Sequence, residues 1–240
     1  VNFGSASGDI GGQALEAVEV SGDEVITTWA GIAGAGVGIA ACLPQAPGVI
    51  RTEYPSEEDL NVGGARTNHV RIISPRYEKI CIGIDDTDTK TEGATWVMAL
   101  KCAEACRIEG VEFLNMRLVQ LNPAVPDKTT NCVSSALNFA VLPKKIPVLL
   151  ESVRLFVEKN TFSRDTGIAC YHGIGDFSNA PVARQVKTEI LTRGQAEHEA
   201  EALGIEFLDQ NNGKGRIGAL GAVIWGNRGT EAAGLYGEHL

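Results

Sequence analysis

Three carboxylates in four positions form the segment Asp85-Asp86-Thr87-Asp88, directly after the apolar run of residues 80–84. Crowded carboxylates repel one another, and a bound cation is the usual way to offset that cost. Oxygen ligands favour Mg²⁺, which keeps several waters and bridges to the phosphates of a nucleotide. The residue types therefore predict a metal site at Asp85, Asp86 and Asp88. A helix-capping loop with solvated acidic side chains is the alternative.

A hydroxyl group follows this acidic segment at Thr95, ten residues after Asp85 and early in an expected helix. Next to a metal–phosphate site, such a hydroxyl could accept a phosphoryl group or coordinate the metal. A threonine in the first turn of a helix is also an ordinary capping residue. The residue types leave both roles open.

Two further segments carry groups that suit phosphate oxygens. Lys128 and Thr129 lie on a loop, residues 122–130, that is stiffened by two prolines. Gly213-Lys214-Gly215-Arg216 precedes a small-residue helix, where glycines allow a close backbone approach and free N–H groups face an anion. The alternatives are a solvated surface lysine for the first segment and a hairpin turn for the second, because Asn-Gly is a strong turn signal.

Several other chemistries have no support in the sequence. The four histidines show no paired metal-ligand spacing, and none of the six cysteines forms C-x-x-C, which argues against a zinc ribbon or a redox pair. There is no G-x-S-x-G for acyl transfer. The glycines of residues 31–38 lack the complete G-x-G-x-x-G spacing, so we expect close helix packing there.

The elements that position these segments alternate along the chain. After a strand at residues 80–84 we expect a helix at 93–107, strands at 113–121 and 132–141 and a helix at 148–159. A strand at 167–172, a helical stretch at 182–203, a strand at 205–208 and a helix from 217 complete this domain, residues 79–240. This order predicts an α/β or α+β fold with mixed sheets covered by helices.

Residues 1–78 are expected to form a separate small α/β unit. Its strands are predicted at 25–29, 49–54 and 70–73, with solvated loops at residues 57–59 and at Gly63-Gly64.

Composition limits the class of protein. The chain of 240 residues is 44% hydrophobic and carries a formal net charge of −9. It has no apolar run of the ~20 residues that would span a membrane. The acidic balance argues against broad binding to a phosphate backbone. We expect a cytoplasmic protein with reduced thiols and no membrane contact, and, since the sequence begins at Val1, an N-terminal portion that is missing.

Three segments together resemble the kinase-like domain of archaeal tRNA(Ile) agmatinylcytidine synthetases: Ile82-Gly-Ile-Asp-Asp-Thr-Asp88, residues 117–129 and residues 213–223. The resemblance covers about residues 79–225. It implies binding of ATP with Mg²⁺, and it implies a role in phosphoryl chemistry for Thr95, which matches the spacing of the synthetase threonine. The chain departs from that family after its motif glycine, where it has Ala94-Thr95-Trp96, and after Thr129. From this comparison we expect the modules that recognise tRNA in the synthetase to be absent.

Over its whole length the chain is more similar to methanogenesis marker protein 11, a family of methanogenic archaea that shares this domain. We therefore expect an ATP- and Mg²⁺-binding protein with a kinase-like domain that transfers a phosphoryl group to an unknown acceptor. The alternatives are an accessory or assembly factor that binds a nucleotide without catalysis, and an RNA-modifying enzyme that needs a partner for RNA recognition. The expected site comprises Asp86 and Thr95 as catalytic residues, Asp85, Asp86 and Asp88 at the metal, and Lys128, Thr129, Gly213, Lys214, Gly215 and Arg216 at the phosphates.

Overall fold

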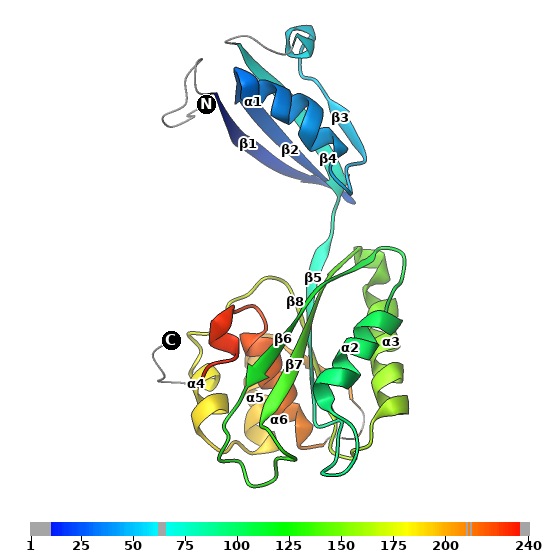
Figure 1. The fold of residues 1–240 in the computed structure, drawn as a ribbon, viewed down its shortest axis with the longest axis vertical. Helices are drawn as coiled ribbons and strands as arrows, with labels where there is room; N and C mark the ends of the chain where they lie inside the picture. The colour runs from blue at the N-terminus through cyan, green and yellow to red at the C-terminus, as the bar shows by residue number, and fades with distance from the viewer. Residues whose placement is uncertain (1–10, 62–65, 210, 212, 236–240) are drawn as a thin grey trace. The chain divides into compact units, whose positions relative to one another are not determined.

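The computed structural model describes residues 11–61, 66–209, 211 and 213–235. The chain divides into two compact units, Val1–Arg76 and Tyr77–Leu240, which are described separately. Strands and helices form layers in both units (Figure 1), which confirms the expected α/β class. Every strand pairing in the described part of the chain is antiparallel rather than mixed.

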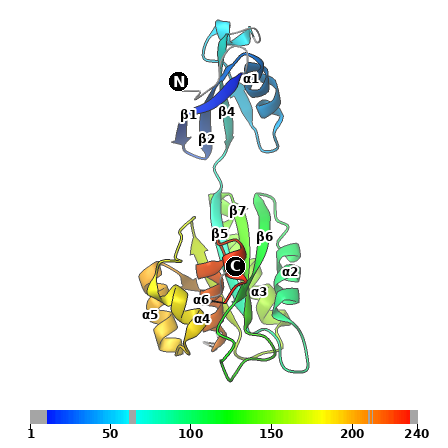
Figure 2. The same ribbon diagram turned by 60° about the vertical axis from the view of Figure 1, so that its left-hand side comes forward.

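The first unit is a four-stranded sheet with helical turns against one face (Figure 2). Helix α1 (Gly34–Val37) continues into a π-helical turn (Gly38–Cys42). A Cβ on Gly31 would lie 2.8 Å from the Ala35 carbonyl oxygen, so the expected close packing of this segment requires glycine. In sheet order the strands are β1 (Gly12–Ser21), β2 (Glu24–Ile32), β4 (Thr67–Pro75) and β3 (Arg51–Glu53).

Two features of this unit differ from the sequence expectation. Strand β1 was not predicted because its alanine, leucine and glutamate residues favour a helix, and pairing along β2 overrides that preference. The segment expected as a solvated loop at residues 57–59 is a 3₁₀ helix (Glu57–Leu60) in which Asp59 is buried. The Asp59 carboxylate accepts hydrogen bonds from Ser56 Oγ and from the His69 backbone N–H, each at 2.7 Å. Gly63-Gly64 lies outside the described residues.

The second unit contains a five-stranded sheet whose central strand carries the acidic segment. Most of the sheet's own buried side chains lie on this central strand and on the strand to either side of it. In sheet order the strands are β6 (Val111–Gln120), β7 (Val133–Val141), β5 (Glu78–Asp85), β8 (Gly167–His172) and β9 (Glu206–Phe207).

Helices cover both faces of this sheet (Figure 1). Helices α2 (Thr95–Ala105) and α3 (Ile146–Asn160) lie on one face, over a core that includes Ile80, Ile82 and Phe139. Helix α6 (Gly215–Trp225) lies directly on the other face. It is so close that a Cβ on Gly83 would be 2.1 Å from the Ala219 carbonyl oxygen. No helix among the described residues combines the length and the apolar character needed to cross a membrane.

The helical stretch expected at residues 182–203 is two helices, α4 (Pro181–Thr188) and α5 (Arg193–Leu203). Thr192 starts the second helix: its hydroxyl accepts from the Gln195 N–H, and the Gln195 side chain accepts from the Thr192 N–H. This capping box satisfies N–H groups that a helix start otherwise leaves unpaired. The sequence Thr-x-x-Gln carries that signal.

A buried lysine connects helix α4 to the base of the loop at residues 122–130 and to the C-terminal segment. The Lys187 side chain lies 4.6 Å from the ring centre of Trp225, and burial lowers its pKa to about 8, so the ammonium form predominates at neutral pH. Four backbone carbonyls lie 2.5–3.3 Å from its Nζ and share its three N–H groups: those of Gln120, Glu231, Ala232 and Gly234.

Replacing Lys187 by methionine is expected to lower the free energy of unfolding by about 2 kcal/mol, because buried carbonyls lose a charged donor. Urea denaturation measures this change. Lys101→Met, at an exposed position of α2, is the matched control and should leave stability close to wild type. Equal free energies of unfolding for Lys187→Met and Lys101→Met would show that the hydrogen bonds of Lys187 to these carbonyls contribute nothing to stability.

Candidate functional site

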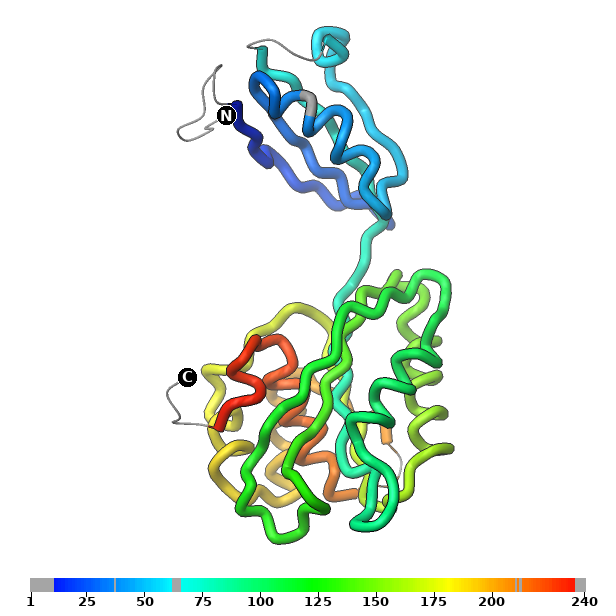
Figure 3. The backbone as a smooth tube through the Cα atoms, in the orientation of Figure 1, coloured from blue at the N-terminus to red at the C-terminus, as the bar shows by residue number. Residues whose placement is uncertain are grey.

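The antiparallel pairing brings three segments to one end of the second sheet. Strand β5 ends at Asp85, and its neighbours β7 and β8 run in the opposite direction, so the residues that precede them reach the same end. These are the β6–β7 loop, with residues 122–130, and the loop of residues 161–166. Figure 3 shows the segment after β5 and the β6–β7 loop at this end of the sheet.

Asp85 lies against the beginning of helix α6. The Asp85 carboxylate is so close to the backbone of this helix that a Cβ on Gly218 would be 1.9 Å from Asp85 Oδ2. Burial raises the pKa of the Asp85 carboxyl well above its ordinary value, and the neighbouring carboxylates of Asp86 and Asp88 raise it further. A proton or a cation therefore stabilises this group in the folded protein.

Asp86 occupies the left-handed backbone region, with φ of 54°. Two hydroxyl groups of the 161–166 loop hold it there: Ser163 Oγ donates to Asp86 Oδ1 at 3.2 Å and Thr166 Oγ1 donates to the Asp86 carbonyl at 2.9 Å. Burial raises the pKa of Asp86, the Ser163 hydrogen bond lowers it, and the charges of Asp165 and Asp88 raise it. Asp86 is thus a fixed carboxylate in an acidic environment.

Asp88 and Thr95 are joined by a hydrogen bond. Thr95 Oγ1 donates to Asp88 Oδ1 at 3.2 Å and accepts from the N–H and the hydroxyl of Thr87, each at 3.2 Å. Thr95 is buried and is the first residue of α2, but its side chain bonds to the acidic segment rather than capping the helix. Thr129 Oγ1, from the β6–β7 loop, also reaches Asp88 Oδ1, at 3.5 Å.

The Gly213–Gly215 turn packs backbone against backbone on the start of β8. A Cβ on Gly213 would lie 2.3 Å from the Asp165 carbonyl carbon, and the Gly215 N–H donates to the Asp165 carbonyl at 2.7 Å. The turn leads directly into α6 and is therefore not a hairpin. Lys214 Nζ forms an ion pair with Asp127 of the β6–β7 loop at 2.6 Å.

The structure does not bring every expected site residue to the acidic segment Asp85–Asp88. The Arg216 guanidinium is bound to Asp209 at 2.8 Å and to Glu197 at 2.9 Å, and it packs on the ring of Phe207. Its charge is therefore balanced away from the acidic segment. Lys128 Nζ donates to the Pro123 carbonyl within its own loop. A phosphate role for either residue stays a prediction.

The donor set fits a Mg²⁺ ion that shares its coordination with phosphate oxygens. Within the described ranges no group of three or more His, Cys, Asp or Glu side chains is arranged to hold a metal alone. Mg²⁺ needs only one or two carboxylates, with waters and phosphates as the other ligands. Ser134 Oγ is buried and without a hydrogen-bond partner. Ile84 pairs with Ser135, and side chains alternate between the two faces along each strand. Ser134 and Asp85, the next residues on their strands, therefore lie on the same face of the sheet. Asp85, Asp86 and Asp88 as metal ligands stay a prediction.

Sequence reasoning missed the 161–166 loop and the role of Asp127. Ser163 and Thr166 support Asp86 from positions 77 and 80 residues away in the sequence, and Asp165 supports the glycine turn. The sequence signal for this loop was the run of hydroxyl residues directly before a predicted strand. That run indicates contacts with Asp86 only when the strand is known to pair with β5.

The second unit is similar to the kinase-like domain of TiaS. The family model described as "TiaS TCKD domain" matches residues 81–148. Two solved structures are similar in fold, "tRNA fluorescent labeling enzyme" with a TM-score of 0.55 and a complex of TiaS with its tRNA and ATP with 0.54. Each is 24% identical over 61% of this chain and 36% of the other, and at this identity the likeness establishes the fold alone.

Relatives extend the comparison beyond this domain. The chain is 35% identical over 211 residues to MJ0921 of Methanocaldococcus jannaschii, over 87% of this chain and 69% of that protein. It therefore belongs to the MJ0921 family. It is also 32% identical over 151 residues to the tRNA 2-agmatinylcytidine synthetase TiaS of Thermococcus sibiricus, covering 60% of this chain. The chain spans 35% of the length of that TiaS protein.

Proposed function

We propose that residues 79–240 bind ATP with Mg²⁺ at the end of β5 and transfer the γ-phosphoryl group to an acceptor that is not yet identified. We also propose that the chain is a member of the methanogenesis marker protein 11 family, in keeping with its relative from Methanocaldococcus. The relation to TiaS, one structure of which is a complex with ATP, supports nucleotide binding.

The observation that carries this proposal is the meeting of three distant segments around Asp85–Asp88. Thr129 contacts Asp88, Lys214 pairs with Asp127 beside Thr129, the glycine turn packs at Asp86, and Gly218 of α6 packs at Asp85. A cation, a glycine turn at a helix start and an acidic segment are thereby placed together. These are the groups that a magnesium–triphosphate ligand requires.

Each group has a separate task in the proposed reaction. When bound, Mg²⁺ offsets the charge between carboxylates and phosphate oxygens. Lys214 stabilises negative charge that develops on the phosphates. Asp88 Oδ1 already accepts the hydrogen bond of Thr95 Oγ1, so it can take that proton when a Thr95 oxygen–phosphorus bond forms and ADP leaves.

Replacement of Thr95 tests this step in single-turnover reactions with γ-labelled ATP. Wild type and Thr95→Ser are expected to carry label on the protein, while Thr95→Val is expected to lose about 100-fold or more of it, because valine has no hydroxyl to take part in covalent catalysis. Mass spectrometry locates the label. Equal labelling of Thr95→Val would exclude Thr95 as the phosphoryl carrier.

The same assay separates phosphoryl transfer from an accessory role. Binding of ATP without labelled protein and without ADP, in the presence of a cell extract that supplies acceptors, would favour the nucleotide-binding assembly factor. Formation of ADP that depends on Asp86 supports catalysis.

A further inference from the structure

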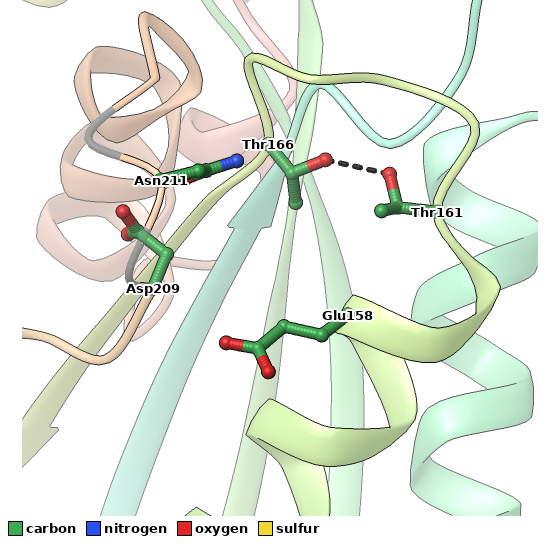
Figure 4. A pocket seen from close by; sticks show the side chains of 5 residues that line it. All are labelled: Glu158, Thr161, Thr166, Asp209 and Asn211. Atoms are coloured by element: carbon green, nitrogen blue, oxygen red, sulfur yellow. Dashed lines mark hydrogen bonds between the residues drawn. The ribbon is translucent and has the colours of Figure 1, made fainter.

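A cavity of about 360 Å³ lies behind the 161–166 loop, and none of its lining residues belongs to the expected site. That volume is within the range of small-molecule sites. Figure 4 shows Glu158, from the end of α3, with its carboxylate directed toward the side on which Asp209 and Asn211 lie. The lining consists of Glu158, Thr161, Thr166, Asp209 and Asn211.

The lining is polar, but its charges are already balanced. Arg154 pairs with Glu158 Oε2 at 2.7 Å, and Asp209 accepts from Arg216 Nε at 2.8 Å and from the Ile168 N–H at 3.0 Å. Among the described residues that line the cavity there is no cationic side chain, which disfavours a phosphate group. The acids of this lining are too few for a metal site of their own. These features select a neutral ligand rich in hydroxyl groups.

The cavity shares a wall with the proposed nucleotide site. Thr166 Oγ1, which lines it, donates to the Asp86 carbonyl at 2.9 Å, and Thr161 Oγ1 lies 3.3 Å from the Thr87 carbonyl oxygen. The two threonine hydroxyls lie 2.6 Å apart, as the dashed line in Figure 4 marks. Only the loop of residues 161–166 therefore separates a group held in the cavity from the acidic segment.

We propose that this cavity binds the ribose of the nucleotide whose phosphates lie at Asp85–Asp88, an inference that rests on the proposed function. Ribose is the neutral, hydroxyl-rich part of a nucleotide and is joined directly to the phosphates. Its vicinal hydroxyls donate to the free oxygen of the Glu158 carboxylate and accept from the Asn211 amide. Carboxylate acceptors of this kind give the stronger class of hydrogen bond.

The test compares ligands that differ only in the sugar. Isothermal titration calorimetry with Mg²⁺ measures ATP, 2′,3′-dideoxy-ATP and inorganic tripolyphosphate against wild type and Glu158→Ala. The expected result is about tenfold weaker binding of dideoxy-ATP than of ATP by wild type, with the difference lost in Glu158→Ala. Tripolyphosphate should bind both proteins equally. The matched control is Glu151→Ala, which removes the other carboxylate partner of Arg154 at 2.6 Å and does not line the cavity.

Equal affinity of wild type for ATP and dideoxy-ATP would overturn the ribose assignment and leave the phosphate site intact. The comparison of ligands on wild type gives this answer even where a variant fails to fold. Absence of binding by both ATP and tripolyphosphate would overturn the proposed function itself, so the two failures are distinguishable.

Discussion

Replacing Asp86 by asparagine is expected to weaken the binding of Mg²⁺·ATP by about 30-fold, the equivalent of ~2 kcal/mol for the loss of one charged partner. Asparagine tolerates the left-handed backbone that Asp86 adopts at φ of 54°, and its amide oxygen still accepts from Ser163. The substitution therefore removes the charge with little change to the fold. Calorimetry gives both affinities.

The loss of ATP affinity in Asp86→Asn should disappear or reverse when the metal is removed. In EDTA, free ATP meets one carboxylate fewer in Asp86→Asn, so its affinity is expected to equal or exceed that of wild type. Glu104→Gln, an exposed charge change on α2, is the control and should bind as wild type in both conditions. Unchanged Mg²⁺·ATP affinity in Asp86→Asn would remove the acidic segment from the site.

Replacing Gly167 by alanine is expected to destabilise the second unit by about 3 kcal/mol, because overpacking of this kind forces the backbone to shift. A Cβ at Gly167, the residue paired with Asp85, would lie 2.1 Å from the Gly215 carbonyl carbon and 2.2 Å from the Arg216 nitrogen. Backbone atoms cannot move aside as a flexible side chain can, so α6 must move away from the sheet. At this chain length the melting temperature should fall by roughly 6–12 °C.

A helical glycine with free space around it provides the comparison. Gly194, in α5, has no atom within 4 Å of an added Cβ. Gly194→Ala is therefore expected to raise stability by about 0.5–1 kcal/mol through better helix propensity. Differential scanning calorimetry of both variants is the measurement, and a Gly167→Ala melting temperature equal to wild type would contradict the close contact of α6 with β8.

The segments with a strong local signal could be found from the sequence. Asp85–Asp88 and the Gly213–Gly215 turn are short runs whose composition itself indicates charge crowding or close backbone approach. Their positions, at the end of a buried strand and at the start of a helix, follow from local patterns of apolar and small residues. The break between α4 and α5 was missed, although Thr192 and Gln195, which form a capping box, carry its signal in the sequence.

The partners that complete the site could not be predicted, because they depend on which strands pair. Ser163 and Thr166 reach Asp86 only because β8 pairs antiparallel with β5, and Lys214 meets Asp127 across 87 positions of sequence. Arg216 shows the converse. Its spacing suits a phosphate, yet the fold places Asp209 and Glu197 beside it.

The most direct test of the central claim is a crystal structure grown with Mn²⁺ and a non-hydrolysable ATP analogue. We expect an anomalous manganese peak within coordination distance of an oxygen of Asp85, Asp86 or Asp88, with the phosphates beside Lys214 and the Gly213–Gly215 turn. A nucleotide bound elsewhere on the chain, or a bound nucleotide with its metal away from these aspartates, would contradict the account.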